Sequence, residues 1–367
     1  MLTTLRYSSL ITRTALTGAA ALALLGCDPD TKETPTPEVR TNSVFVINEG
    51  AYGSPTGTVS LFDIASAKVT GLDIFQAANG RPLLSDVTQS MTVVGEHGYI
   101  VANNSNKIEV VALPSFKSVA TISTGLKLPR YLVAASADKA YVSEWVTPTY
   151  PTPGPGRVSI INLKTNTVTG TIAVGKAPEE MLLANGKLFV TNSEENTVTV
   201  INTTTDAVET TLTVGPAPAS LILDNNGRVW VLGNGVTNYA DPALSSKGSL
   251  SDFAPTAPYT VRKRDFGTDL GYLARLRTNG THDLLYVKTD GAILRLTPSD
   301  ATLPTTPYLT RKSSDIYGLN IDPNDNTVYV GVAPTFSGPG KFIRYNAAGK
   351  ALDSAAVGIG PNGFIFY

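Results

Sequence analysis

Charged side chains directly follow a proline at two places after residue 42. Arg130 comes after Pro129, and the pair Glu179 and Glu180 comes after Pro178. Arginine and carboxylate groups can pair with each other or make charge-assisted hydrogen bonds to a ligand. Adjacent glutamates point to opposite sides of an extended strand, so they form no ready acid and base couple. These motifs predict a mixed-charge binding site or, in the blander interpretation, groups that hydrate a channel mouth.

Other reactive residue types are sparse. His97 and His282 fall in short turns that are predicted to lie far apart, and the chain has no nucleophile elbow, phosphate loop or His-rich metal motif. Asp322, Asn324 and Asn326 have the alternate spacing of a calcium loop but lack its glycine and distal glutamate, so a turn is expected. We therefore predict a protein that is not an enzyme and that holds no metal or cofactor.

Aromatic and amide side chains gather in long irregular segments, at 48–57, 144–156, 233–248 and 333–340. Aromatic rings with polar partners suit a large, mostly neutral ligand that carries amides. An alternative for each asparagine is that it ends a strand and tolerates turn geometry. The candidate ligand-binding residues are Asn48, Glu49, Tyr52, Asn103, Asn104, Arg130, Trp145, Tyr150, Glu179, Asn192, Asn234, Tyr239, Tyr272 and Phe336.

A unit of about forty residues positions these groups, and residues 175–215 show it most completely. An apolar run opens at Gly175 and Pro178 and ends at Ala184. After an Asn-Gly turn, three further runs alternate with period two and are rich in β-branched residues. The unit is therefore predicted to form four short strands joined by tight turns.

The second strand of the unit recurs along the chain. Its copies begin near residues 44, 99, 141, 189, 229, 285 and 328, and each carries one aromatic residue at an equivalent position: Phe45, Tyr99, Tyr141, Phe189, Trp230, Tyr286 and Tyr329. Four-stranded units of this length bury their faces by packing around an axis. The sequence thus predicts an all-β fold, a seven-bladed β-propeller over residues 43–367.

The two ends of the repeat region are complementary. Residues 358–367 have the opening strand of a unit, whereas residues 42–48 have a second strand without a first. Pairing the terminal strands would complete a blade and remove an exposed edge. A β-sandwich with long loops, the alternative fold, predicts no such ends.

Propeller geometry also predicts which face carries the site. Loops between second and third strands and loops between blades share one face, and the four long segments all belong to it. Arg130, Glu179, Glu180 and Tyr272 begin or precede innermost strands on the same face, so they are expected near the axis. Function is often carried on such irregular loops.

Composition excludes several partners. The 29 basic and 30 acidic residues leave a net charge of −1, with no footprint for nucleic acid or an anionic membrane. The basic run 262–264 falls in a predicted outermost strand and is expected to be solvated. A single cysteine, Cys27, rules out a disulfide framework within the chain.

The first 27 residues are predicted to be a signal peptide, because Arg6 and Arg13 precede an apolar stretch too short to span a bilayer. Its end, Leu24 to Cys27, resembles a bacterial lipobox, which implies acylation of Cys27 and a lipid anchor as the sole membrane contact. Residues 28–42 are then predicted to form an extended tether of about 45 Å at roughly 3 Å per residue. The acidic residues after Cys27 favour the outer surface of an outer membrane over its periplasmic face.

The repeats resemble the YVTN-type repeats of YncE-like seven-bladed propellers, on the units at 174–215 and 214–234. The segment VFVINEGAYGSPTGTVSLFD at 44–63 is similar to the first blade of the surface corrinoid-binding BtuG group of lipoproteins. That resemblance implies capture of vitamin B12 or a related corrinoid for a TonB-dependent outer-membrane transporter. The alternative is a protein-interaction propeller of the cell envelope without a small ligand, and a propeller enzyme is a third, weaker possibility.

Overall fold

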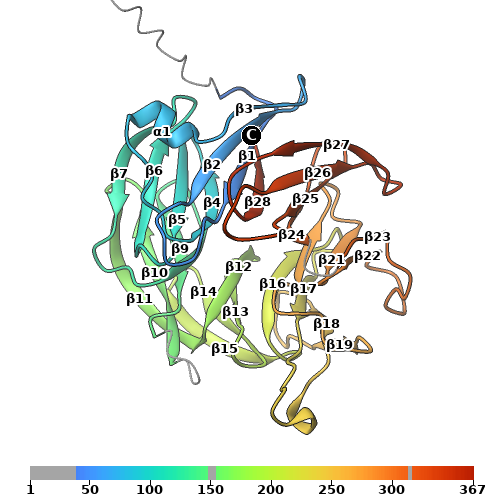
Figure 1. Cartoon of the computed structure of the whole chain (residues 1–367). Helices are drawn as coiled ribbons and strands as arrows, with labels where there is room; N and C mark the ends of the chain where they lie inside the picture. Colours follow the sequence, from blue (N-terminus) through green and yellow to red (C-terminus); the bar gives the residue numbers. More distant parts are fainter. Residues whose placement is uncertain (1–38, 148–153, 313–315) are drawn as a thin grey trace, which may run out of the picture. The chain divides into compact units, whose positions relative to one another are not determined.

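A computed structural model describes residues 39–147, 154–312 and 316–367. In these residues the strands form seven antiparallel sheets of four strands each, set around an axis like the blades of a propeller (Figure 1). The predicted all-β, seven-bladed propeller is confirmed. The helix α1 (Ile74–Asn79) and the short 3-10 helix η1 (Pro242–Leu244) lie in connections between strands.

The two inner strands of each blade surround the axis. From blade 1 to blade 7, the innermost strands are β28 (Pro361–Phe366), β4 (Thr88–Val94), β8 (Pro129–Ala134), β12 (Pro178–Ala184), β16 (Pro218–Leu223), β20 (Arg275–Thr278) and β24 (Ile316–Ile321). The second strands, in the same order, are β1 (Ser43–Asn48), β5 (His97–Ala102), β9 (Lys139–Glu144), β13 (Lys187–Asn192), β17 (Val229–Gly233), β21 (Leu285–Lys288) and β25 (Val328–Val332).

The two outer strands complete each blade. The third strands are β2 (Thr58–Asp63), β6 (Lys107–Ala112), β10 (Pro155–Asn162), β14 (Thr197–Asn202), β18 (Ser249–Phe253), β22 (Ala292–Leu296) and β26 (Lys341–Tyr345). The outermost strands are β3 (Lys68–Gly71), β7 (Lys117–Ile122), β11 (Thr167–Lys176), β15 (Ala207–Thr213), β19 (Arg262–Asp265), β23 (Leu309–Thr310) and β27 (Ala351–Ala356).

The ring closes through the predicted pairing of its terminal strands. β28 pairs antiparallel with β1, with Val46 opposite Phe364 and Val44 opposite Phe366. Beyond this ladder, the Tyr367 amide donates to the Ser43 carbonyl at 2.9 Å. In Figure 1 the red β28 lies beside the blue β1, so the first blade is built from both ends of the propeller.

The seven repeated aromatic residues explain how the blades hold together. All are buried, and each belongs to a different apolar cluster between two adjacent blades. Because side chains alternate along a strand, the aromatic residue packs on one neighbouring blade while the residues beside it pack on the other. In β1, for example, Phe45 joins the cluster with blade 2, and Val44 and Val46 join the cluster with blade 7.

The first strand of the unit begins later than the sequence predicts. Gly175 belongs to β11 of blade 3, and β12 of blade 4 begins only at Pro178, because Lys176 still pairs with Pro155. The helix α1 was not predicted; it is six residues long, and capping residues define both of its ends. Asp73 accepts from the Gln76 amide at the start, and Gly80 adopts a left-handed conformation at the end.

Residues 1–38, with the predicted leader, Cys27 and most of the tether, lie outside the described residues. Within the part of the chain that the structure describes, no helix is long and apolar enough to cross a membrane.

Candidate functional site

One backbone feature recurs at the mouth of the propeller. Among the described residues, the residue before an innermost strand has a positive φ in five blades: Val87, Leu128, Ala177, Ala217 and Gly360. The carbonyl of this residue accepts a hydrogen bond from the backbone amide of the residue that directly follows the second strand. These donors are, in the same order, Asn103, Trp145, Ser193, Asn234 and Glu49. A left-handed conformation is costly for residues other than glycine, so the surrounding structure must impose it. This elbow fixes four of the predicted site residues, Glu49, Asn103, Trp145 and Asn234, at the loop face.

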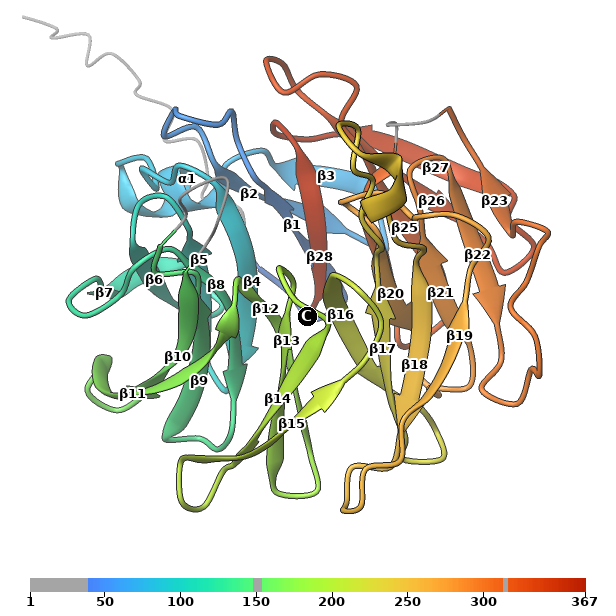
Figure 2. The same ribbon diagram turned by 90° about the horizontal axis from the view of Figure 1, so that it is seen from below.

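A cavity of about 680 Å³ opens on this face and follows the axis. Innermost strands of blades 1, 2, 3, 4, 6 and 7 contribute to its walls, and Tyr52 and Tyr272 stand at its rim. A second cavity of about 430 Å³ lies beside it under the loops of blades 4 to 6, where Asn234 and Tyr239 line it. Tyr272 and Arg275 line both cavities. Figure 2 shows α1 and the yellow-gold loop that carries η1 on one and the same side of the ring.

Arg130, which lines the axial cavity, meets Glu179, which lines the second cavity. The Arg130 Nη2 group donates to both Glu179 oxygens at 2.8 and 3.0 Å, and Nη1 donates to Gln89 Oε1 at 2.5 Å. The guanidinium also lies over the Trp145 ring, 4.2 Å from its centroid. The sequence matched Arg130 and Glu179 as equivalent positions of neighbouring blades, and the structure joins them in a buried, two-point ion pair.

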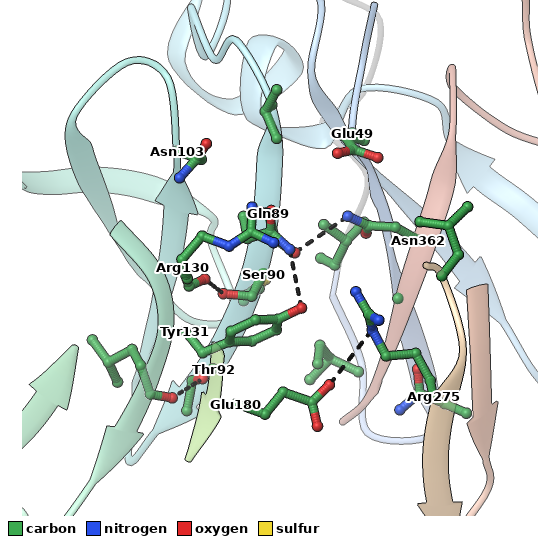
Figure 3. Close-up of a pocket in the computed structure, with 18 of the residues that line it drawn as sticks. Glu49, Gln89, Ser90, Thr92, Asn103, Arg130, Tyr131, Glu180, Arg275 and Asn362 are labelled. Atoms are coloured by element: carbon green, nitrogen blue, oxygen red, sulfur yellow. Dashed lines mark hydrogen bonds and ion pairs between the residues drawn. The ribbon is translucent and has the colours of Figure 1, made fainter. Parts of the chain in front are cut away.

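A second charged group lies deeper along the axis. Glu180 reaches from β12 to blade 6, where Arg277 donates to its two oxygens at 2.9 and 3.1 Å. The Nε atom of Arg275 is 4.0 Å from Glu180 Oε1. Figure 3 shows Arg275 and Glu180 pointing into the cavity from facing walls, below Asn362. One carboxylate is thus shared by two arginines.

Among the described residues, Glu49 and Glu180 are the two acidic residues that line the axial cavity. Burial raises the pKa of the Glu49 carboxyl to about 7, although the nearby Arg130 and Arg275 charges oppose the shift. Its Oε2 atom is buried and has no hydrogen-bond partner among the described residues. Glu49 can therefore act as a hydrogen-bond donor or acceptor near neutral pH.

Lys288 lies at the end of β21 with its side chain fully buried, and its Nζ donates to the Ile316 carbonyl at 3.2 Å. Burial, together with the positive charges of Arg275 and Arg277, lowers the pKa of Lys288 from 10.5 to about 7, and Asp290 partly offsets this. Between these two pH values the unfolded chain binds a proton that the folded chain does not bind. The contribution of Lys288 to stability is therefore present at high pH and lost as pH falls toward 7.

We predict that Lys288→Met removes this pH dependence. The free energy of unfolding of the wild type, relative to the variant, should rise by about 1 kcal/mol per pH unit between roughly pH 7.5 and 9.5. Urea unfolding at several pH values measures the difference. Parallel pH profiles for the two proteins would contradict the assignment of a neutral lysine.

The other predicted residues fall into four groups. Asn103 and Asn104 line the axial cavity, and their amides donate to Pro129 O at 2.9 Å and Asp86 Oδ2 at 3.4 Å. Asn48 and Asn192 are fully buried inside their blades, each donating to two hydroxyls of the next strand, and neither lines a cavity. Phe336 packs edge-on against Tyr317, which lines the axial cavity, with 4.9 Å between the centroids of the two rings. Tyr150 lies outside the described residues.

Several cavity residues were not found by sequence reasoning. Gln89, Tyr317 and Asn362 occupy the position of Arg130 in their blades, and Tyr131 and Arg275 occupy the position of Glu180. Aligning the innermost strands on the aromatic residue of the second strand would have identified all of them, because that register is shared by every blade. In the described residues, no group of three or more His, Cys, Asp or Glu side chains is arranged to hold a metal ion.

Solved structures show the same fold at low identity. The chain is similar to a quinonprotein alcohol dehydrogenase-like protein from Bacteroides thetaiotaomicron VPI-5482, with 14% identity and a TM-score of 0.66 over 89% of this chain and 78% of that one. It is also similar to a functionally unknown protein from Desulfotomaculum acetoxidans DSM 771, with 12% identity and a TM-score of 0.64 over 89% and 98% of the two chains. The hydrazine synthase of Kuenenia stuttgartiensis matches with 13% identity and a TM-score of 0.60 over 86% and 96%. These likenesses concern the fold alone.

No curated protein matches the chain. A family model does match, over residues 42–357, and it carries the description "Domain of unknown function (DUF5074)". This match covers nearly all of the propeller. The protein is therefore a seven-bladed β-propeller that belongs to the DUF5074 family.

Proposed function

We propose that the protein captures a large ligand rich in amides in the axial cavity of its loop face, and that it binds rather than transforms this ligand. The observation that carries the proposal is a set of buried polar atoms on residues that line the cavity, none of which has a partner in the described residues: Glu49 Oε2, Arg130 Nε, Trp145 Nε1 and Asn362 Oδ1. A buried polar atom without a partner costs about 1–3 kcal/mol. A ligand that offers both donors and acceptors, as amides do, recovers that cost.

The cavity has suitable dimensions and walls. Its volume of about 680 Å³ lies in the range of small-molecule sites. Tyr52 and Tyr272 at the rim are 84% and 67% exposed, so their rings are available as platforms for a ligand. The specific ligand that we propose is a corrinoid such as vitamin B12, which carries many amides, and the resemblance of residues 44–63 to the BtuG group supports it.

We also propose where in the cell the protein acts. Cys27 would carry the lipid anchor and hold the propeller at the outer surface of an outer membrane. The captured ligand would pass to a TonB-dependent transporter. These statements rest on the sequence around Cys27 and on the family resemblance.

A calorimetric titration of residues 28–367 with cyanocobalamin tests the proposal. We expect a saturable heat with one site per chain, and at least a tenfold loss of affinity in Tyr272→Ala, because Tyr272 lines both cavities and truncation of an aromatic residue that holds a ligand costs about 2 kcal/mol. Leu352→Ala is the matched control, since Leu352 is 52% exposed on the outermost strand β27 and lines neither cavity. No heat at micromolar cyanocobalamin would contradict corrinoid capture.

A protein partner on the same face is the second candidate, and exposed rim residues favour it. Tyr239, for example, is 93% exposed, and exposed aromatic residues are typical of protein interfaces. This candidate predicts co-purification with a TonB-dependent transporter in the absence of ligand. Loss of that association in Tyr239→Ser, with cyanocobalamin affinity unchanged, would assign the rim to the partner and the cavity to the ligand.

A further inference from the structure

Arginines in the axial cavity outnumber their carboxylate partners. Arg130 pairs with Glu179, and Arg277 pairs with Glu180, each through two hydrogen bonds. Arg275 has only the distant contact with Glu180, at 4.0 Å, and its Nη1 group donates to the Ala274 carbonyl at 2.8 Å. One guanidinium charge in the cavity is therefore not matched by a carboxylate in direct contact.

Among the described residues, no other charged group is in direct contact with Arg275. Glu49 has a pKa raised to about 7, so it carries only part of a negative charge at neutral pH. Lys288 lies directly opposite Arg275 in the register of β20 and β21. Its pKa is lowered mainly by burial and further by the positive charges of Arg275 and Arg277, whereas Asp290 partly offsets the shift.

A hydroxyl donor faces the same part of the cavity. The Tyr131 hydroxyl accepts a hydrogen bond from Gln89 Nε2 at 3.0 Å, which leaves its own O–H group to donate. Burial raises the pKa of Tyr131 above its usual value of 10, so the hydroxyl keeps its proton at neutral pH. In Figure 3 the Tyr131 hydroxyl and the Arg275 guanidinium point into the cavity from opposite walls.

We infer that Arg275 and Tyr131 form a subsite for an oxyanion group of the ligand, either a carboxylate or a phosphate ester. This inference rests on the proposed function of the axial cavity as a ligand site. A guanidinium binds an oxyanion through parallel hydrogen bonds, and the low solvent exposure of Arg275, 16% for its side chain, strengthens the interaction. Because Arg275 lines both cavities, an anionic group there would anchor a ligand that extends into either of them.

Calorimetric titration with inorganic phosphate and with acetate tests the subsite, and sodium chloride at matched ionic strength supplies the baseline. We expect a saturable response to at least one oxyanion in the wild type, and the tighter one indicates whether the natural group is a phosphate or a carboxylate. Arg275→Gln should weaken binding at least tenfold. Tyr131→Phe should weaken it several-fold and serves as the second variant if Arg275→Gln does not fold.

Arg295→Gln is the matched control. It removes the same charge from blade 6, but Arg295 lies on the third strand β22, over Tyr308, and lines neither cavity. Oxyanion affinity should not change in this variant. Equal affinity in the wild type, Arg275→Gln and Tyr131→Phe would overturn the inference, and so would the absence of a saturable oxyanion response in the wild type.

The experiment separates this inference from the proposed function. Cyanocobalamin that binds while neither oxyanion does would overturn the subsite and leave ligand capture intact. Oxyanions that bind through Arg275 while cyanocobalamin does not bind would retain the subsite and overturn the corrinoid proposal.

Discussion

Replacing Glu179 with glutamine is expected to lower the free energy of unfolding by about 3–5 kcal/mol. The Glu179 and Arg130 side chains are only 4% and 8% exposed, so the variant leaves the arginine charge buried without its carboxylate. The pair also joins β8 of blade 3 to β12 of blade 4 at the mouth, so its loss weakens the contact between two blades. Chemical denaturation at neutral pH measures the effect.

Two controls separate buried charge from charge in general. Asp138→Asn breaks the ion pair with Lys164 of the same blade, whose side chains are 54% and 70% exposed, and should cost well under 1 kcal/mol. The double variant Arg130→Met with Glu179→Leu should recover much of the loss, because no unpaired charge remains. Equal costs for Glu179→Gln and Asp138→Asn would contradict the buried pair.

Deletion of residues 361–367 is expected to prevent stable folding of the propeller. The deletion removes β28, which exposes the inner edge of β1 and uncovers the apolar cluster between blades 1 and 7, where Phe364, Tyr329 and Phe342 pack together. Loss of one buried phenylalanine alone costs about 3–5 kcal/mol. Loss of the whole strand should therefore lower the free energy of unfolding by about as much as the total stability of a typical domain. Circular dichroism and thermal unfolding report the outcome.

Moving the strand provides the control. The Asn42 amide donates to the Tyr367 carbonyl at 2.7 Å, so the end of β28 lies beside the start of β1. A chain in which residues 358–367 precede Asn42 through a two-residue Asn-Gly turn should form a hairpin and restore cooperative unfolding. A deletion variant that still unfolds with the wild-type midpoint would contradict closure by β28.

Sequence reasoning predicted the fold well because the repeat constrains it at every blade. The aromatic residue of each second strand, such as Phe45 or Trp230, identifies the register, and the structure places each of the seven in its own cluster between blades. Complementary ends predicted the pairing of β28 with β1. The helix α1 was not predicted because six residues are too few to show helical periodicity. Its capping residues, Asp73 and Gly80, are recognised only once the fold is known.

The candidate site was predicted less completely, for a geometric reason. Arg130 and Glu179 belong to adjacent blades, so their shared position in the repeat was enough to bring them together. Glu180 and Arg277 are separated by blade 5 and meet only because the ring turns innermost strands toward a common axis. Asn48 was predicted from its residue type alone, yet its side-chain amide donates hydrogen bonds to the Thr58 and Ser60 hydroxyls within its own blade.

The central claim is that ligand binds at the axial cavity of the loop face, and amide hydrogen exchange with and without cyanocobalamin tests it most directly. Ligand capture predicts slower exchange at the amides around the mouth, in residues 49–53, 103–106 and 271–275, and no change in the turns of the opposite face at 95–97 and 225–228. Protection confined to the opposite face, or no protection at a saturating concentration of cyanocobalamin, would contradict the account.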